Sequence, residues 1–162
     1  MVDDRAKLEK AEALVNEGLR AQQDGQTDRA IELYRNSIEV FPTAEGYTYL
    51  GWALSDQGKL DEAIELCRQA IQIDPDFGNP YNDIGVYLMH RNQFDEAIPW
   101  LERAKQATRY EPRHFPFINL GRIYAQRGQL FKAIEEFKGA LEFVPGDKRI
   151  RGQIAALSAM LN

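Results

Sequence analysis

The fold of this 162-residue chain is decided by the stretch YTYLGWAL at residues 47–54, followed by Gly58 and then by DEAIE at residues 61–65. Related stretches recur on both sides of it. Glycines recur at intervals of 33, 34 and 36 residues, at Gly18, Gly51, Gly85 and Gly121. Alanines keep the same three intervals, at Ala30, Ala63, Ala97 and Ala133. Because self-similarity at a period of about 20–50 residues is the signature of a repeat protein, these landmarks predict a repeated structural unit.

Apolar residues within each unit follow the spacing of an α-helix. In the second unit they fall on one face of a helix over residues 47–54 and on one face of another over residues 60–71. Gly58 lies between the two, and Asn92 takes its place in the third unit; both residue types suit the left-handed conformation in which helices often end. Each unit is therefore predicted to be a helix, a tight turn and a second helix.

This pattern resembles the tetratricopeptide repeat, a helix–turn–helix unit of about 34 residues. In family order, its landmarks in the second unit are Tyr47, Leu50, Gly51, Leu54, Gly58, Ala63, Cys67, Ala70 and Pro75. In the fourth unit they are Phe117, Leu120, Gly121, Tyr124, Gly128, Ala133, Phe137, Ala140 and Pro145. The resemblance covers about residues 11–146 and implies an all-α, right-handed α-solenoid of four such units plus a C-terminal capping helix.

The predicted boundaries follow the repeat landmarks. They are a helical lead-in at 1–10, repeats at 11–43, 44–77, 78–113 and 114–146, and a capping helix at 147–162. The third repeat has two extra residues before the link RYEPRH (109–114), so either its second helix runs longer or the link bulges. In the last segment Ile150, Ile154, Leu157 and Leu161 share one helical face. Since a solenoid needs an end that covers its last apolar face, this helix is predicted to be the cap.

Composition excludes several classes of function. A net charge of −5 and an isoelectric point near 5.1 argue against a nucleic-acid surface, which would carry clustered Lys and Arg. No stretch approaches the roughly 18 apolar residues of a membrane span. The N-terminal residues MVDDRAK lack the apolar core of a signal peptide, and a cytoplasmic location is predicted. The single cysteine, Cys67, permits no internal disulfide.

The sequence contains no motif that indicates catalysis. The two histidines, His90 and His114, belong to different repeats. HExxH, CxxC, GxSxG and a glycine-rich phosphate loop are all missing from the sequence. Cys67 occupies a core landmark, where a buried thiol is usually inert. We therefore expect no enzyme, no cofactor and no metal site.

The resemblance implies that the first helices of successive repeats line a concave groove in which peptides or partner helices bind. The candidate groove residues are Leu19, Tyr49, Trp52, Asn82, Val86, Met89, Phe115, Ile118, Asn119 and Arg122. Trp52 is the strongest candidate, because other residues of its helix already supply the buried face; an exposed aromatic among polar neighbours is typical of a binding hot spot. The alternative is that Trp52 packs on a neighbouring repeat. Asn82 and Asn119 are expected to hydrogen-bond a peptide backbone through both amide atoms.

Charge predicts two further features of the surface. The groove positions carry Glu12, Glu45, Asp56 and Asp83 against Arg122, which favours a neutral or basic ligand. A secondary basic patch is predicted at Arg109, Arg113 and His114, where an acidic partner would dock; the alternative is an ordinary solvated loop.

Three functions remain open at the level of sequence. The first is a monomeric, non-enzymatic adaptor or scaffold that binds a peptide or helix of a protein partner in its groove. The second is an accessory subunit that docks through its convex face or end cap on a larger assembly, such as a filament, motor or secretion machine. The third is a homo-oligomeric scaffold whose copies associate through the capping helix.

Overall fold

The computed structural model describes residues 2–162, which form helices connected by short turns and loops. The helices are α1 (Val2–Gln23), α2 (Thr27–Val40), α3 (Ala44–Asp56), α4 (Leu60–Ile73), α5 (Asn79–His90), α6 (Phe94–Gln106), α7 (His114–Gln126), α8 (Leu130–Phe143) and α9 (Lys148–Met160). The residues predicted as a lead-in are thus the first turns of α1. Over the described residues, no helix has the length and apolar character needed to cross a membrane.

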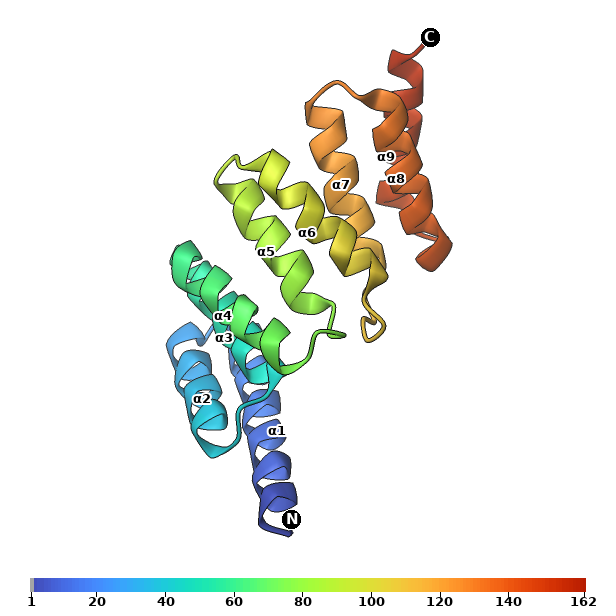
Figure 1. Ribbon diagram of the computed structural model, residues 1–162. Coiled ribbons are helices and arrows are strands. Elements are labelled where there is room, and N and C mark those ends of the chain that lie inside the picture. The colour runs from blue at the N-terminus through green and yellow to red at the C-terminus, as the bar shows by residue number, and fades with distance from the viewer. Residues whose placement is uncertain (1) are drawn as a thin grey trace.

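The helices form antiparallel pairs that stack from the N-terminal to the C-terminal end of the molecule (Figure 1). The pairs are α1/α2, α3/α4, α5/α6 and α7/α8, and α9 lies against α8. Helices α1, α3, α5 and α7 also contact one another in succession, so the first helices of the pairs share one surface. The prediction of an all-α solenoid is confirmed.

The turn within each pair has the conformation that the sequence predicted. Gly58 has a φ angle of 77° and Asn92 one of 58°, both in the left-handed region. A side chain at Gly58 would have open space around it, so the backbone conformation and not crowding favours glycine there. Asn92 shows that asparagine is tolerated in the same conformation.

The small landmark residues lie where two helices of a pair approach closely. Ala63 is fully buried, and a methyl group added at Gly51 would lie 3.1 Å from the Ala63 carbonyl oxygen. Cys67 is also fully buried, with its Sγ 3.5 Å from the same point. The core therefore consists of layers of buried side chains between successive helices, as expected of a solenoid. In each layer a small residue lets the two helices approach closely.

Replacing Ala63 with leucine is expected to destabilise the protein by about 1–3 kcal/mol, because the added atoms have no room between α3 and α4. Thermal or urea denaturation measures this change. The matched control is Ala13→Leu on the exposed side of α1, which is expected to stay within about 0.5 kcal/mol of the wild type. Equal stability of the two variants would contradict the close approach at Ala63.

The link between α6 and α7 is the irregular part of the stack. Helix α6 ends at Gln106 and α7 begins at His114, so the extra residues form a bulged loop (the α6–α7 loop, residues 107–113) and do not lengthen α6. The loop reaches back to the α4–α5 link: Arg109 N donates to the Asp76 carbonyl (2.9 Å), and Gly78 N donates to the Arg109 carbonyl (3.0 Å). The sequence left open whether the helix would lengthen or the link would bulge, and it did not predict this docking.

Tyr110 fixes the α6–α7 loop to the stack. Its side chain is only 5% exposed and covers Gly78, where a methyl group would lie 2.3 Å from Tyr110 Cγ. Glycine at this position therefore allows the ring to lie directly on the backbone of the preceding link. Tyr81, Ala104 and Ala107 complete this small apolar cluster.

The last helix covers the end of the stack with its first half. Asp147 caps α9 by accepting hydrogen bonds from the backbone N–H groups of Arg149 (2.9 Å) and Ile150 (3.1 Å). Ile150 is buried against α8, and Ile154 is half-buried. Leu161 follows the last helical residue and is exposed, so it does not contribute to the covered face as predicted.

Candidate partner-binding groove

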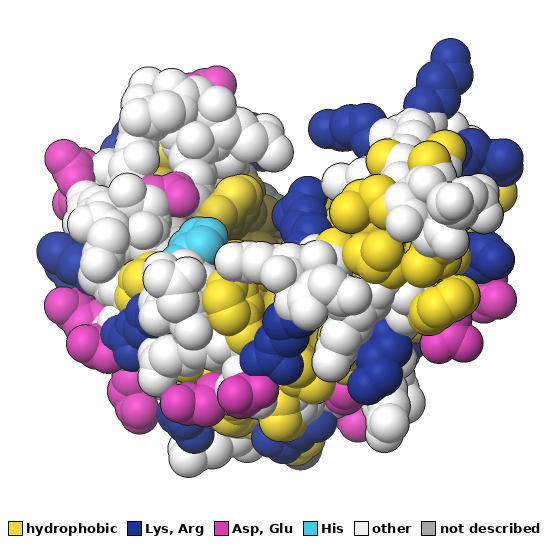
Figure 2. Space-filling model, turned by 90° about the horizontal axis from the view of Figure 1, so that it is seen from above, with side chains coloured by type: hydrophobic (Ala, Val, Ile, Leu, Met, Phe, Trp, Pro, Cys, Tyr) yellow, Lys and Arg dark blue, Asp and Glu magenta, His cyan; other side chains and the backbone are white. Residues whose placement is uncertain are grey.

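Helices α1, α3, α5 and α7 line one side of the molecule, where cavities lie between neighbouring helices. Figure 2 shows a face that is hollowed between two lobes, with hydrophobic side chains at the floor and Lys and Arg side chains on one wall. The first cavity, the α1–α3 pocket, has a volume of about 250 Å³ and is lined by Glu12, Val15, Asn16, Leu19, Thr43, Glu45 and Tyr49.

A second cavity, the α7–α9 pocket, lies at the other end of this row of helices. Its volume is about 320 Å³, and it is lined by His114, Phe115, Ile118, Asn119, Arg122, Asp147, Arg149, Ile150 and Gln153. The groove residues predicted from the sequence include those of α7, whereas α9 was predicted only to be a cap. The sequence did contain an indication of this pocket. On α9 the polar residues Arg149 and Gln153 directly precede the apolar residues Ile150 and Ile154, which indicates a polar side next to the buried one.

A third cavity of about 590 Å³ lies beside the α6–α7 loop. It is lined by Tyr49, Phe77, Asn79, Thr108, Arg109, Tyr110, Glu111, Pro112 and Arg113. Tyr49 belongs to this cavity and to the α1–α3 pocket, so the two adjoin at α3.

Trp52 on α3 is 42% exposed, so its indole is not sealed between repeats. Phe115 on α7 is also exposed, and its ring lies 4.3 Å from that of His114. The half-buried groove candidates are Leu19, Tyr49, Val86, Met89 and Ile118, and Arg122 is exposed. These side chains are available to a ligand to different degrees, and their role in binding stays a prediction.

Asn82 and Asn119 lie deeper than the sequence predicted. Each is 7% exposed, and Asn119 Nδ2 donates to Asn82 Oδ1 over 3.0 Å. The two amides are therefore partly occupied with each other, and fewer of their atoms face a partner backbone than expected. The sequence contained an indication of this burial: Asn82 lies two positions before the core residue Ile84, and Asn119 lies one position before the core residue Leu120.

Asp83 is a half-buried carboxyl group on α5 with tyrosine rings around it. Burial raises its pKa to about 7, although the hydrogen bond with Asn82 acts in the opposite direction. No ion pair to Asp83 occurs within residues 2–162. Helix α5 therefore holds a carboxyl group whose ionisation a cation would favour.

Replacing Asp83 with asparagine is expected to change the pH dependence of stability. An aspartate in an unfolded chain titrates near pH 3.9, so with a folded pKa of about 7 the wild type takes up a proton on folding between about pH 4 and pH 7. The stability that protonated Asp83 adds to the fold is fully present below about pH 4 and is lost as the pH rises to about 7. The stability of Asp83→Asn relative to the wild type should therefore increase over that range, as measured by urea denaturation. Exposed Asp24→Asn is the control, and a difference for Asp83→Asn that does not vary with pH would contradict the assignment.

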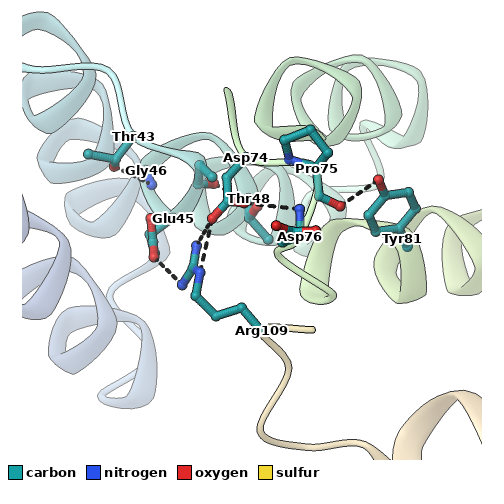
Figure 3. Close-up of polar contacts among 10 residues, drawn as sticks. Thr43, Glu45, Gly46, Thr48, Asp74, Pro75, Asp76, Tyr81 and Arg109 are labelled. Carbon is teal, nitrogen blue, oxygen red and sulfur yellow. Dashed lines mark hydrogen bonds and ion pairs between the residues drawn. The ribbon is translucent and has the colours of Figure 1, made fainter. Parts of the chain in front are cut away.

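Two residues of the predicted basic patch at Arg109, Arg113 and His114 make contacts within the fold. Arg109 bridges two other segments, as Figure 3 shows: its guanidinium pairs with Glu45 on α3 (2.7 Å) and with Asp74 after α4 (2.5 Å). It also lies 4.2 Å above the Phe77 ring. Arg113 donates to the Thr108 carbonyl (3.0 Å) within its own loop. Arg109 is therefore a clamp within the fold, and docking of an acidic partner at the three residues stays a prediction.

The clamp also influences the protonation of Asp74. Burial raises the pKa of this carboxyl group, but hydrogen bonds from Arg109 and from the backbone of Asp76 and Phe77 outweigh that effect and hold the pKa below its ordinary value. Asp74 therefore stays ionised at neutral pH, and the α6–α7 loop remains bound to the α4–α5 link.

Cys67 lies fully inside the core, and burial raises the pKa of its thiol well above the ordinary value, which keeps it in the unreactive neutral form. Among the residues that the structure describes, no three His, Cys, Asp or Glu side chains are grouped so that they would hold a metal ion.

Comparisons with known proteins agree with this architecture. Two family models described as tetratricopeptide repeat match residues 44–77 and 81–109. The mitochondrial import receptor subunit TOM70 of Rattus norvegicus is 27% identical over 144 residues, which are 88% of this chain and 23% of the receptor. The type IV pilus assembly protein PilF of Pseudomonas aeruginosa is 28% identical over 139 residues, which are 85% of this chain and 55% of PilF. The chain thus spans about a quarter and about half of these relatives.

A solved structure from a functional characterisation of Pseudomonas aeruginosa PilF superposes with a TM-score of 0.87 at 26% identity. The alignment covers 94% of this chain and 69% of that chain. Both the sequence and the arrangement of helices are therefore similar to those of a pilus assembly protein over most of this chain.

Proposed function

Because the chain belongs to the tetratricopeptide-repeat family, whose repeats are protein–protein interaction modules, we propose that it is a non-enzymatic adaptor. It holds a peptide or a helix of a protein partner in the groove formed by α1, α3, α5 and α7. The observation that carries this proposal is the exposure of Trp52, which leaves 42% of a large aromatic residue in contact with water on α3.

The surroundings of Trp52 support a binding role. Large aromatics that become desolvated on binding, with polar residues around them, dominate the energy of many protein interfaces. Half-buried Tyr49 and Met89 extend the apolar surface, while exposed Asp56 and half-buried Ser55 supply polar neighbours on the same helix as Trp52. The repeat fold is a scaffold for interactions, and neither matching family model is that of an enzyme.

The test is the effect of Trp52→Ala on peptides that the wild-type protein selects from a random library. The proposal expects the selected peptides to lose affinity for this variant while the fold is retained. Peptides that bind both proteins equally would place the site elsewhere.

A second candidate function, docking on a larger assembly, is favoured by the C-terminal end. Phe131 at the start of α8 is 74% exposed, and Met160 and Leu161 at the end of the antiparallel helix α9 are also exposed. The relatives named above include a receptor subunit and a pilus assembly protein. We propose this end as a docking surface for an assembly or for another copy of the chain. The cytoplasmic location of the protein stays a prediction.

Light scattering separates these uses of the C-terminal end. A measured mass of about 18.6 kDa would exclude the homo-oligomer and leave the end available to an assembly. A multiple of that mass that Phe131→Asp reduces to one chain would favour the homo-oligomer.

A further inference from the structure

Acidic and basic residues of the concave side lie at different ends of the stack. Acidic side chains lie on the first three helices of the row, at Glu12, Glu45, Asp56 and Asp83. The α7–α9 pocket at the other end contains Arg122 and Arg149. Its one carboxylate, Asp147, is engaged in capping α9 through the N–H groups of Arg149 and Ile150. The two ends of the groove therefore offer opposite charges to a ligand.

The two arginines of the α7–α9 pocket have no partner among the described residues. Within residues 2–162, the guanidinium groups of Arg122 and Arg149 make no hydrogen bond and no ion pair. Most other arginines are engaged in ion pairs, backbone hydrogen bonds or ring contacts: Arg5, Arg29, Arg68, Arg91, Arg103, Arg109, Arg113, Arg127 and Arg151. Arg20 and Arg35 are also unpaired but line neither groove pocket.

The apolar floor of the same pocket makes these two charges more effective. Ile118 and Phe115 on α7 and Ile150 on α9 line it together with the arginines. A carboxylate bound there would be partly removed from water, and a charge-assisted hydrogen bond from Arg is shorter and stronger than a neutral one. Arg also presents a planar fork that binds a carboxylate through two parallel hydrogen bonds.

The α1–α3 pocket at the opposite end is lined by no Lys or Arg side chain. Glu12 in the α1–α3 pocket makes no hydrogen bond or ion pair to the described residues, and Asp83 on α5 has no cationic partner among them. Glu45 is shared with Arg109, and Asp56 accepts a hydrogen bond from neutral Gln22. This end therefore favours Lys, Arg or an amino group of a ligand.

We infer that the groove binds a partner segment in one direction, with acidic residues or a terminal carboxylate in the α7–α9 pocket and basic residues at the α1–α3–α5 end. This inference rests on the proposed function. Three steps of about 8–10 Å between packed helices separate α1 from α7, or about 24–30 Å. An extended chain covers about 3.3 Å per residue, so about seven to nine residues connect the two ends. The charges mainly set orientation and specificity, while Trp52 supplies affinity.

The experiment uses a displayed random library of peptides about 12 residues long, which is enough to span the groove. The library is selected on the wild type, on Arg122→Glu/Arg149→Glu, on Glu12→Lys, and on the control Arg20→Glu/Arg35→Glu. The control changes the net charge by the same amount as the first double variant but leaves both pockets intact. Fluorescence polarisation then gives the affinity of individual peptides selected on the wild type.

The wild type is expected to enrich peptides with basic residues towards one end and acidic residues towards the other. Arg122→Glu/Arg149→Glu should lose only the acidic preference and weaken wild-type-selected peptides roughly tenfold. Glu12→Lys should lose only the basic preference, and the control should bind as the wild type does. Enriched peptides without this layout, or equal weakening by the control, would overturn the inference.

Failure of the inference can be distinguished from failure of the proposed function. If Trp52→Ala weakens the selected peptides and Arg122→Glu/Arg149→Glu does not, the groove is the site but its charges do not orient the ligand. If Trp52→Ala leaves their binding unchanged, the groove is not the site and both proposals fail.

Discussion

Replacing Trp52 with alanine is expected to weaken the binding of wild-type-selected peptides by about thirtyfold or more. Truncation of an aromatic hot spot at the centre of an interface costs about 2 kcal/mol or more, which corresponds to that ratio. The indole is 42% exposed in the free protein, so its removal takes little from the core and the melting temperature should stay within a few degrees of the wild type. Fluorescence polarisation and a thermal melt measure the two quantities.

The matched control is Phe131→Ala on α8, which removes an even more exposed aromatic, 74% exposed, outside the groove. This variant should bind the peptides as tightly as the wild type does. If the two variants weakened binding equally, a general loss of surface hydrophobicity would explain the result. If only Phe131→Ala did so, the C-terminal end of the stack would be the binding surface.

Replacing Tyr110 with alanine is expected to destabilise the protein by about 3–5 kcal/mol, the usual cost of truncating a buried large aromatic. The ring is 5% exposed, and it holds the α6–α7 loop on the backbone of Gly78. Its loss leaves a cavity beside Tyr81 and Ala104 and frees the segment whose Arg109 clamps α3 to the α4–α5 link. The free energy of unfolding in urea measures the effect.

Tyr110→Phe is the control for this prediction, because the hydroxyl group makes no hydrogen bond to any residue that the structure describes. It should therefore change the stability by about 0.5 kcal/mol or less. A loss below about 1 kcal/mol for Tyr110→Ala would mean that the loop is only loosely attached and that the stack is held by its helices alone.

The sequence predicted the helices and their stacking because these depend on local patterns. The spacing of Gly51 and Ala63 recurs in every repeat, and each small residue marks a close approach between neighbouring helices. Gly58 and Asn92 mark turns whose backbone conformation few residues tolerate. The exposure of Trp52 followed from the same periodicity, since the core face of α3 was already occupied.

The features that the sequence did not predict depend on contacts that break the repeat. Arg109 pairs with Asp74, 35 residues away, and with Glu45, 64 residues away, through a loop that occurs in one repeat only. Arg113 and His114 follow it within five residues, so the segment was predicted to be a basic patch. Asn119 and Asn82 lie one position apart in the register of successive repeats, and only the packing of α5 against α7 shows that their side chains meet.

The most direct test of the central claim uses the chain's two tryptophans, which lie on a first and a second helix of different pairs. Trp52 on α3 is 42% exposed and is predicted to face the groove, whereas Trp100 on α6 is half-buried beneath Arg68 and Arg103. With fluorotryptophan incorporated, the ¹⁹F NMR resonances are assigned with Trp52→Phe and Trp100→Phe and then followed while a wild-type-selected peptide is added. Binding in the groove predicts that the Trp52 resonance shifts and the Trp100 resonance does not. A shift of Trp100 with an unchanged Trp52 would contradict the account.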